Sequence, residues 1–231
     1  VTDQPTGEGD KVTVTIESLG DVQENAVGKF SVKISQELKQ DLTVTLNNGD
    51  KVVIKAGTTE SPYEIKAQGD DVYKDGETIK VSISDATVDG KTFENLVIGD
   101  AAELNVTDTT SEVIATLSVD QTSIVEGGSV TYKVTLTNAA GLPINNHGAL
   151  TFTLTDGTTI TVPANTSVGS AIVATTNDVF TGGQPSLVNK LDTVTGSEKF
   201  EKLTLDQTTL TTTVTDQPTG EGDKVTVTIE S

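Results

Sequence analysis

The eighteen residues VTDQPTGEGDKVTVTIES stand at Val1–Ser18 and recur without a change at Val214–Ser231, so the two blocks begin 213 residues apart. An identical block at such a spacing indicates a tandem array, and we expect the chain to be an internal piece of one. The block combines two patterns. TDQPTGEGD is rich in Pro, Gly and acidic residues, as linkers are, whereas KVTVTIE alternates apolar and polar residues, as a half-buried strand does. The repeated block therefore predicts a junction between domains.

The composition excludes several classes of function. The chain has no Cys, which excludes a disulfide scaffold and thiol chemistry. Its 34 acidic and 15 basic residues give a net charge of −19, which argues against nucleic acid or an anionic membrane as a partner. No apolar run approaches the ~18 residues that a membrane-spanning helix needs. We therefore expect a monomeric piece that neither binds nucleic acid nor inserts into a membrane.

Short strands separated by turn residues run along the whole chain, and no window has a convincing helical period. The turn Asn47-Asn48-Gly49-Asp50 has the composition of a β-hairpin. Short strands at this density predict an all-β sandwich or barrel. In the first half the expected strands are Lys11–Glu17, Lys29–Ser35, Leu42–Leu46, Lys51–Lys55, Tyr63–Ala67, Glu77–Ile83 and Ala102–Val106.

The second half repeats this plan. Val22–Ile34 aligns with Ile124–Leu136, and Leu42–Ile54 aligns with Leu150–Val162. The halves are therefore diverged copies of one domain of ~105 residues, half of the block spacing. We predict two tandem immunoglobulin-like β-sandwich domains joined end to end. Their ranges are 11–110 and 111–216, with a linker from a preceding repeat at 1–10 and a linker and first strand of a following repeat at 217–231.

Six of the eight aromatic residues fall at matched places in the two copies. The pairs are Phe30 with Tyr132, Tyr73 with Phe180, and Phe93 with Phe200. Large side chains at equivalent positions of both copies are expected to fill the two cores.

Acidic residues occupy loops that the predicted topology brings together. In a seven-stranded sandwich the loop after the first strand, the loop after the fifth and the end of the last strand lie at one pole. Converging carboxylates repel one another unless a hard cation lies among them, and Ca²⁺ accepts six to eight oxygen ligands. The sequence therefore predicts Ca²⁺ at the junctions, the alternative being plain solvated acidic loops. The candidate ligands are Glu24, Asp70, Asp71 and Asp108 in the first copy, Glu126, Asp178 and Asp216 in the second, and Glu112, Glu221 and Asp223 in the linkers.

A family resemblance rests on the same motifs. The acidic turn in VQENAVG and IVEGGS, the hairpin LTDGTT, the pairs DDVY/NDVF and FENL/FEKL, and the closing VTDT resemble the extender repeats of large RTX-type bacterial adhesins. The similarity extends to the repeats of biofilm and ice-binding adhesins and covers roughly residues 11–216. It implies a secreted chain at the bacterial cell surface whose linkers are stiffened by Ca²⁺. The residues that match the family's acidic positions are Glu24/Glu126, Asp71/Asp178 and Asp108/Asp216.

We therefore expect a non-catalytic spacer that holds a distal adhesive domain away from the cell, in adhesion and biofilm formation, with neighbouring repeats as its contacts. One alternative is a calcium-dependent ligand- or glycan-binding module that uses the 138–148 loop, and another is homophilic adhesion through free edge strands. Catalysis lacks its components, because a Ser/His/Asp triad would have to use the single His147. This His lies in the loop INNHGA, where a solvated polar residue is expected.

Overall fold

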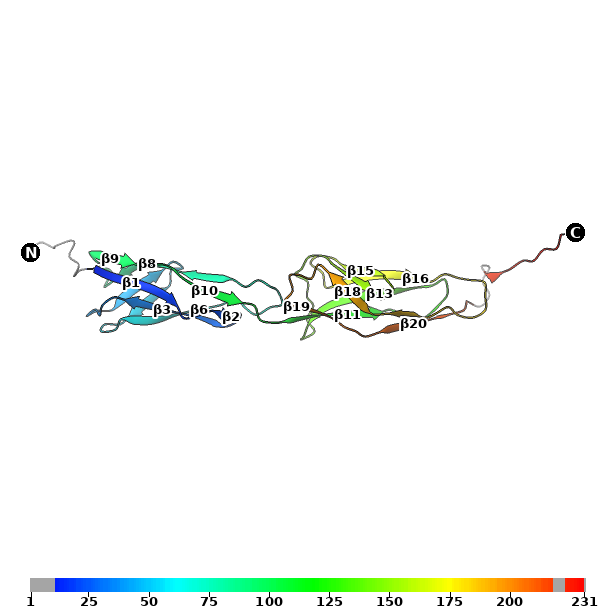
Figure 1. The fold of residues 1–231 in the computed structure, drawn as a ribbon, viewed down its shortest axis with the longest axis horizontal. Coiled ribbons are helices and arrows are strands. Elements are labelled where there is room, and N and C mark those ends of the chain that lie inside the picture. The colour runs from blue at the N-terminus through cyan, green and yellow to red at the C-terminus, as the bar shows by residue number, and fades with distance from the viewer. Residues whose placement is uncertain (1–10, 218–222, 231) are drawn as a thin grey trace, which may run out of the picture. The chain divides into compact units, whose positions relative to one another are not determined.

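The computed structural model describes residues 11–217 and 223–230 (Figure 1). The chain divides into two compact units. Unit 1 contains the chain up to Asp71 together with Asp75–Thr109, and unit 2 contains Val72–Lys74 and the chain from Thr110 onward. Among the described residues there is no helix of the length and apolarity needed to cross a membrane.

Unit 1 is built of strands in three sheets. The sheet orders are β6-β3-β1-β9, β5-β4-β8 and β2-β10-β7. The bounds are β1 (Lys11–Ser18), β2 (Val22–Gln23), β3 (Val27–Ile34), β4 (Leu42–Leu46), β5 (Lys51–Ile54), β6 (Glu60–Lys66), β7 (Thr78–Val81), β8 (Ile83–Thr87), β9 (Asn95–Ile98) and β10 (Ala102–Thr107).

Unit 2 repeats this arrangement strand for strand. Its sheet orders are β16-β13-β11-β19, β15-β14-β18 and β12-β20-β17. The bounds are β11 (Glu112–Val119), β12 (Ser123–Val125), β13 (Ser129–Asn138), β14 (Leu150–Leu154), β15 (Thr159–Val162), β16 (Val168–Ala174), β17 (Leu187–Asn189), β18 (Leu191–Thr195), β19 (Lys202–Leu205) and β20 (Leu210–Thr215).

The first strand segment of each unit changes sheets, and this change positions the acidic turn. In unit 1, β1 pairs antiparallel with β3 and parallel with β9, whereas β2 pairs parallel with β10, with Val106 opposite Val22. In unit 2, β12 pairs in the same way with β20, with Val214 opposite Ile124. The turn after β2 or β12 therefore lies beside the end of the last strand. The predicted all-β fold of two tandem immunoglobulin-like sandwiches is confirmed.

Alternating burial along the strands builds one hydrophobic core in each unit. Strands β4 and β14 both bury every second residue, as strands with one face on a core do. The hairpin turns that follow them need a backbone conformation that favours glycine. Gly49 has a φ of 88° and Gly157 a φ of 86°, and each donates its amide to the last residue of the preceding strand. The hairpin predicted at residues 47–50 is therefore confirmed.

One expected strand is interrupted. Residues 77–83 are divided between β7, which pairs with β10, and the start of β8, which pairs with β4. Ser82 lies between them, and its amide donates to the side-chain oxygen of Asn47 (3.2 Å). The chain therefore passes from one sheet to another at a point where the alternation of apolar residues gives no sign of it. The short strands β2 and β9 were also not predicted from the sequence.

The matched aromatics do not all fill cores. Phe30 and Tyr132 are buried, and Phe200 is 2% exposed, but its counterpart Phe93 is only half-buried. Phe180 is 74% exposed, so the prediction that it fills a core is wrong. Its amide donates to Asp178 Oδ1 (2.9 Å), and this turn holds the segment outside the strands, where no layer covers the ring.

The expectation of a solvated His147 is also wrong. This side chain is buried, and its ring centroid lies 5.7 Å from that of Phe200. Its Nδ1 lies 2.5 Å from the carbonyl oxygen of Gly148. The residue is buried because the 138–148 loop, whose Ile144 packs against the core of unit 2, folds back over that core. The polar composition of INNHGA does not indicate this.

Candidate functional site

In unit 1, three carboxylates lie close together around the turn after β2. Glu24, Asp71 and Asp75 each offer one oxygen, and these oxygens lie within 4.8 Å of one another. Glu24 is buried, whereas the two Asp residues are exposed. The backbone fixes Glu24, because its amide donates to the carbonyl of Thr107 at the end of β10 (3.1 Å). The turn thus holds a buried acid beside two exposed ones from the loop between β6 and β7.

A glutamine amide lies among these carboxylates. Gln68 Nε2 donates to Glu24 Oε1 (2.8 Å) and to Asp75 Oδ1 (2.9 Å). The second oxygen of Glu24 accepts the amide of Thr109 (3.3 Å). Glu24 therefore has a donor on each oxygen, so its burial leaves no carboxylate oxygen unsatisfied.

The remaining predicted ligands of unit 1 lie in the same region. Asp108 is half-buried, and its Oδ1 accepts the amide of Asp75 (3.2 Å). Asp70 is exposed and accepts a hydrogen bond from the hydroxyl of Thr109. The structure therefore brings the predicted ligands Glu24, Asp70, Asp71 and Asp108 into one region, and it adds Asp75, which was not predicted from the sequence.

Unit 2 places Glu126 at the equivalent turn in very different surroundings. Its side chain is 1% exposed, and its amide donates to the carbonyl of Thr215 (2.9 Å). Both carboxylate oxygens are buried, and neither has a hydrogen-bond partner among the residues that the structure describes. A buried carboxylate without donors is strongly disfavoured in its charged form, so this group requires a partner.

The charges near Glu126 increase this requirement. Burial raises the pKa of the Glu126 carboxyl, and the negative charges of Asp178 and Asp216 raise it further. The backbone amide of Gln217 opposes this shift in pKa, although it does not reach hydrogen-bonding geometry with either oxygen. The electrostatic field at Glu126 therefore favours either a proton or a cation.

Asp178 and Asp216 are half-buried, and each is oriented by a backbone amide. Asp178 accepts the amide of Phe180 (2.9 Å), and Asp216 Oδ2 accepts the amide of Gly182 (3.0 Å). Asp223 lies beside Asn177, whose Nδ2 donates to its Oδ1 (3.0 Å). No trio of carboxylates as tight as that of unit 1 is found around Glu126 within residues 11–217 and 223–230.

Of the predicted linker ligands Glu112 and Glu221, the structure describes Glu112, which joins neither of these clusters. Glu112 lies on β11, where it pairs with Lys202 (2.9 Å) and accepts the hydroxyl of Thr204 (2.5 Å). These two contacts hold the pKa of Glu112 below its usual value. Glu112 is thus engaged inside its own sheet. Glu221 lies outside the described residues.

The two poles differ because of the residues that precede the acidic loop. Gln68 is replaced in unit 2 by Thr175, and the next residue, Gly69, is replaced by Thr176. The Thr175 hydroxyl donates to the carbonyl of Gly128 (3.1 Å), and the Thr176 hydroxyl accepts from Gln184. Unit 2 therefore lacks the amide that satisfies the buried acid of unit 1. From the sequence, the one feature that could have identified Gln68 as a donor to the buried acid was its position directly before the acidic loop.

The oxygens of both groups are ligands of the kind that hard divalent cations prefer. Glu126 gives the clearest fit, because its two buried oxygens, which no described residue hydrogen-bonds, can be satisfied by direct coordination. In unit 1, by contrast, a cation would have to displace the amide of Gln68. The geometry therefore suits a cation at both poles, with the stronger requirement in unit 2.

Comparison with known proteins gives one family match. The LapA domain matches this chain twice, over residues 10–109 and 113–217. A search of curated proteins finds no match.

Several solved structures match the chain at low sequence identity. The crystal structure of CBD12 from CALX1.2 is 12% identical, with a TM-score of 0.31, over 87% of this chain and 99% of that one. A tetra-tandem repeat in the extending region of a large adhesion protein is 13% identical, with a TM-score of 0.38, over 87% of this chain and 49% of that one. The Escherichia coli adhesin FdeC is 13% identical, with a TM-score of 0.30, over 87% of this chain and 63% of that one.

Proposed function

Because the chain belongs to the LapA domain family, a family of large adhesins, we propose that it is a non-catalytic extender segment of a bacterial cell-surface adhesin. In this proposal the chain is secreted and spaces a distal adhesive domain away from the cell, in adhesion and biofilm formation. Its contacts are neighbouring repeats of the same protein. Ca²⁺ bound at the acidic poles makes the repeats rigid.

One observation carries the calcium part of the proposal. Glu126 buries two carboxylate oxygens that have no hydrogen-bond donor among residues 11–217 and 223–230, next to Asp178 and Asp216. In the absence of a cation, the negative charges at this pole repel one another. A bound Ca²⁺ would be shared by these carboxylates and would replace their repulsion with coordination.

The residues that would hold the ion are therefore Glu126, Asp178 and Asp216 in unit 2, and Glu24, Asp71 and Asp75 in unit 1. In both units these residues come from the turn after the second strand and from the loop that follows β6 or β16, and in unit 2 also from the end of the last strand. A shared ion would tie these chain segments together and remove freedom from the loop. The mechanism is mechanical, because it changes the stiffness and unfolding resistance of the repeat and involves no reaction.

The first test is a calcium titration of the full chain by isothermal titration calorimetry. Extracellular modules bind Ca²⁺ with a Kd of about 10⁻⁴–10⁻³ M, and we expect at least one site in this range. Glu126→Gln should remove the site in unit 2. Asp192→Asn, which removes one exposed charge from β18 of the same unit, should leave it intact. Binding that is unaffected by Glu126→Gln would contradict the proposed site.

The second test asks whether calcium changes stiffness. Small-angle X-ray scattering of the full chain in ~5 mM Ca²⁺, which exceeds the expected Kd, is compared with scattering in EDTA. The stiffened spacer predicts a narrower distribution of dimensions with calcium and a broader one without it. Identical profiles, in the presence of measured binding, would refute stiffening while leaving the site intact.

The structure gives no specific support to a glycan site in the 138–148 loop. Asn138 Oδ1 accepts the amides of Ala140 and Leu142 inside the loop, at 3.0 and 2.9 Å. The buried His147 anchors the far end of the loop. These contacts give the loop a structural role, so we make no second proposal.

A further inference from the structure

Two equivalent tripeptides have opposite surroundings. Val72–Lys74 follows Asp71, and Val179–Thr181 follows Asp178. Val72 belongs to the hydrophobic core of unit 2, with Tyr73 packed against the same core. Val179 and Phe180, by contrast, are exposed, and the ring of Phe180 is 74% accessible. The same apolar pair therefore packs against a hydrophobic core in one copy and is exposed to solvent in the other.

The body of unit 2 shows how such a tripeptide is held. Tyr73 forms an antiparallel β-bridge with Phe200. On either side of the bridge the amide of Lys74 donates to the carbonyl of Lys199 (2.9 Å), and the amide of Glu201 donates to the carbonyl of Val72 (3.0 Å). The rings of Tyr73 and Phe200 stack with centroids 5.5 Å apart. The tripeptide is thus bound by backbone pairing and by an aromatic contact, as strand-addition peptides are.

Unit 1 has the equivalent receiving residues, but no tripeptide from the described part of the chain is paired with them. Phe93 is the counterpart of Phe200. It lies just before β9, as Phe200 lies just before β19, and it is half-buried. No β-bridge to Phe93 is found in the part of the chain that the structure describes. Instead, Phe93 lines a groove of about 340 Å³. The other lining residues are Leu38, Lys39, Gln40, Val88, Asp89, Lys91 and Thr92.

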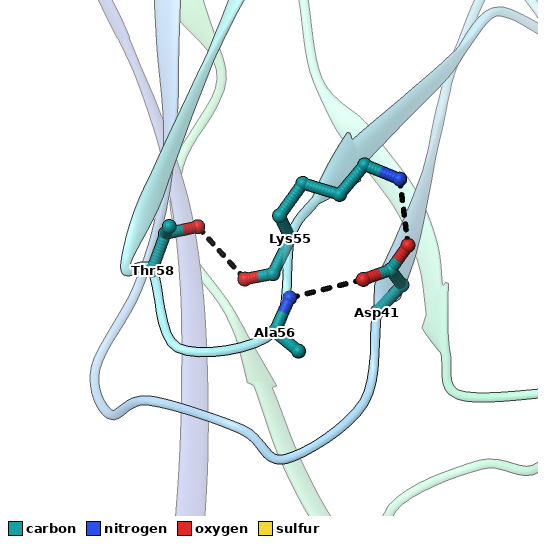
Figure 2. A network of polar contacts seen from close by, with 4 residues as sticks. All are labelled: Asp41, Lys55, Ala56 and Thr58. Atoms are coloured by element: carbon teal, nitrogen blue, oxygen red, sulfur yellow. Dashed lines mark hydrogen bonds and ion pairs between the residues drawn. The ribbon is translucent and has the colours of Figure 1, made fainter.

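The walls of this groove are fixed by hydrogen bonds. Leu38 accepts the amide of Gly57 (2.9 Å), and Gln40 Nε2 donates to Asp89 Oδ2 across the groove (3.2 Å). Next to Gln40, Asp41 pairs with Lys55 (2.7 Å) and accepts the amide of Ala56 (3.0 Å), as Figure 2 shows. The groove is therefore a preformed feature of unit 1.

We propose that this groove binds the Val179–Phe180 segment of a second copy of the chain, with Phe180 stacked on Phe93. The occupant is argued from the equivalent contact inside unit 2, where Val72 and Tyr73 fill this position against Phe200. Charge supports the same occupant, because Lys39 and Lys91 line the groove and Asp178 precedes the segment. The contact joins different surfaces of the two copies, so it links them head to tail. The contact itself involves no cation, but Asp178 is also a proposed Ca²⁺ ligand, so the contact is tested in EDTA.

The test is a nuclear magnetic resonance titration of the full chain. The isotope-labelled chain carries Phe180→Ala, so that its groove reports only on the added partner. The unlabelled partner is added to ~2 mM, because a single contact of this size is expected to have a Kd near millimolar. We expect wild-type partner to shift the amide signals of Leu38 and Phe93. A Phe180→Ala partner should produce shifts at least fivefold smaller.

The matched control partner is Ile172→Ala, which removes an apolar side chain of similar exposure (73%) from β16 of the same unit. It should shift the groove signals as the wild type does. Shifts that persist with the Phe180→Ala partner would show that another segment fills the groove, and absence of shifts with wild-type partner would show that the groove binds no second copy. Either result would overturn the proposal. Phe180 is exposed, so its replacement leaves the fold intact, and the dispersion of the spectrum verifies this.

Discussion

Phe93 and Phe200 offer a paired test, because they occupy the same place in two copies of one fold and differ in what covers them. Phe200 is 2% exposed, with Tyr73 and His147 against its ring. Replacing a buried Phe by Ala costs about 3–5 kcal/mol, since it removes apolar contact and leaves a cavity. Phe93 is half-buried beside an open groove, so Phe93→Ala leaves no sealed cavity. It should cost roughly 1–2 kcal/mol from lost apolar burial alone.

For a unit of ~100 residues, 1 kcal/mol changes Tm by about 4–8 °C. Phe200→Ala should therefore lower the Tm of unit 2 by roughly 12–40 °C, and Phe93→Ala should lower that of unit 1 by roughly 4–16 °C. Differential scanning calorimetry of the full chain is the assay, because two separate cores should give two transitions. Phe200→Leu provides a milder variant if the Ala variant does not fold.

Leu46→Ala and Leu154→Ala are the matched controls. These two Leu residues are equivalent and equally buried at the ends of β4 and β14, so their replacement should destabilise the two units by similar amounts. Equal losses for Phe93→Ala and Phe200→Ala would refute the reasoning. That result would mean that Tyr73 and His147 add nothing to the burial of Phe200.

Three further outcomes are expected. In EDTA, Glu126→Gln should leave the Tm of unit 2 unchanged or raise it, since it removes a buried charge without donors. In ~5 mM Ca²⁺, wild-type unit 2 should gain roughly 5–15 °C, by calorimetry, and this variant should gain none. Gly183→Ala should lower the Tm of unit 2, because its Cβ would lie 2.2 Å from a backbone carbonyl of β20, whereas Gly69→Ala meets nothing within 4 Å and should be neutral. The hydrogen bond from Lys80 lowers the pKa of Glu103 in the folded chain. The stability that this exposed pair contributes is therefore fully present above the usual Glu pKa, and it is lost as the pH falls through the lowered pKa of Glu103. The Tm difference between wild type and Glu103→Gln at pH 7 should therefore disappear at low pH and in high salt.

Local sequence patterns were sufficient to predict the architecture. The alternation in KVTVTIES and LTVTL corresponds to strands that bury every second residue, and the turn residues at Asn47–Asp50 form the expected hairpin. These features depend on neighbours a few residues apart, so the sequence displays them directly. The repeat of the pattern in the second half then predicted a second sandwich of the same kind.

The surroundings of single side chains could not be predicted in this way. Tyr73 and Phe180 share a motif and a position, yet only Tyr73 lies against a core. His147 is covered through the fold of a whole loop, and Glu126 is held against the end of β20 at Thr215, 89 residues later in the chain. Burial of this kind is decided by long-range contacts, whereas composition and periodicity report only on the local segment.

Glu24 and Glu126 occupy equivalent positions on the same backbone fold, yet their buried carboxylates differ in hydrogen bonding. Both follow the second strand of a sandwich, and the backbone amide of each donates a hydrogen bond to a carbonyl at the end of the last strand. In unit 1 the amide of Gln68 satisfies the buried acid, and that carboxylate is stable without any ligand. In unit 2 the equivalent Thr175 hydroxyl is turned to a backbone carbonyl, and no described residue donates to the acid, so a proton or a cation would satisfy it. The residue that precedes one surface loop therefore sets whether a repeat requires an ion, while the sandwich itself stays the same.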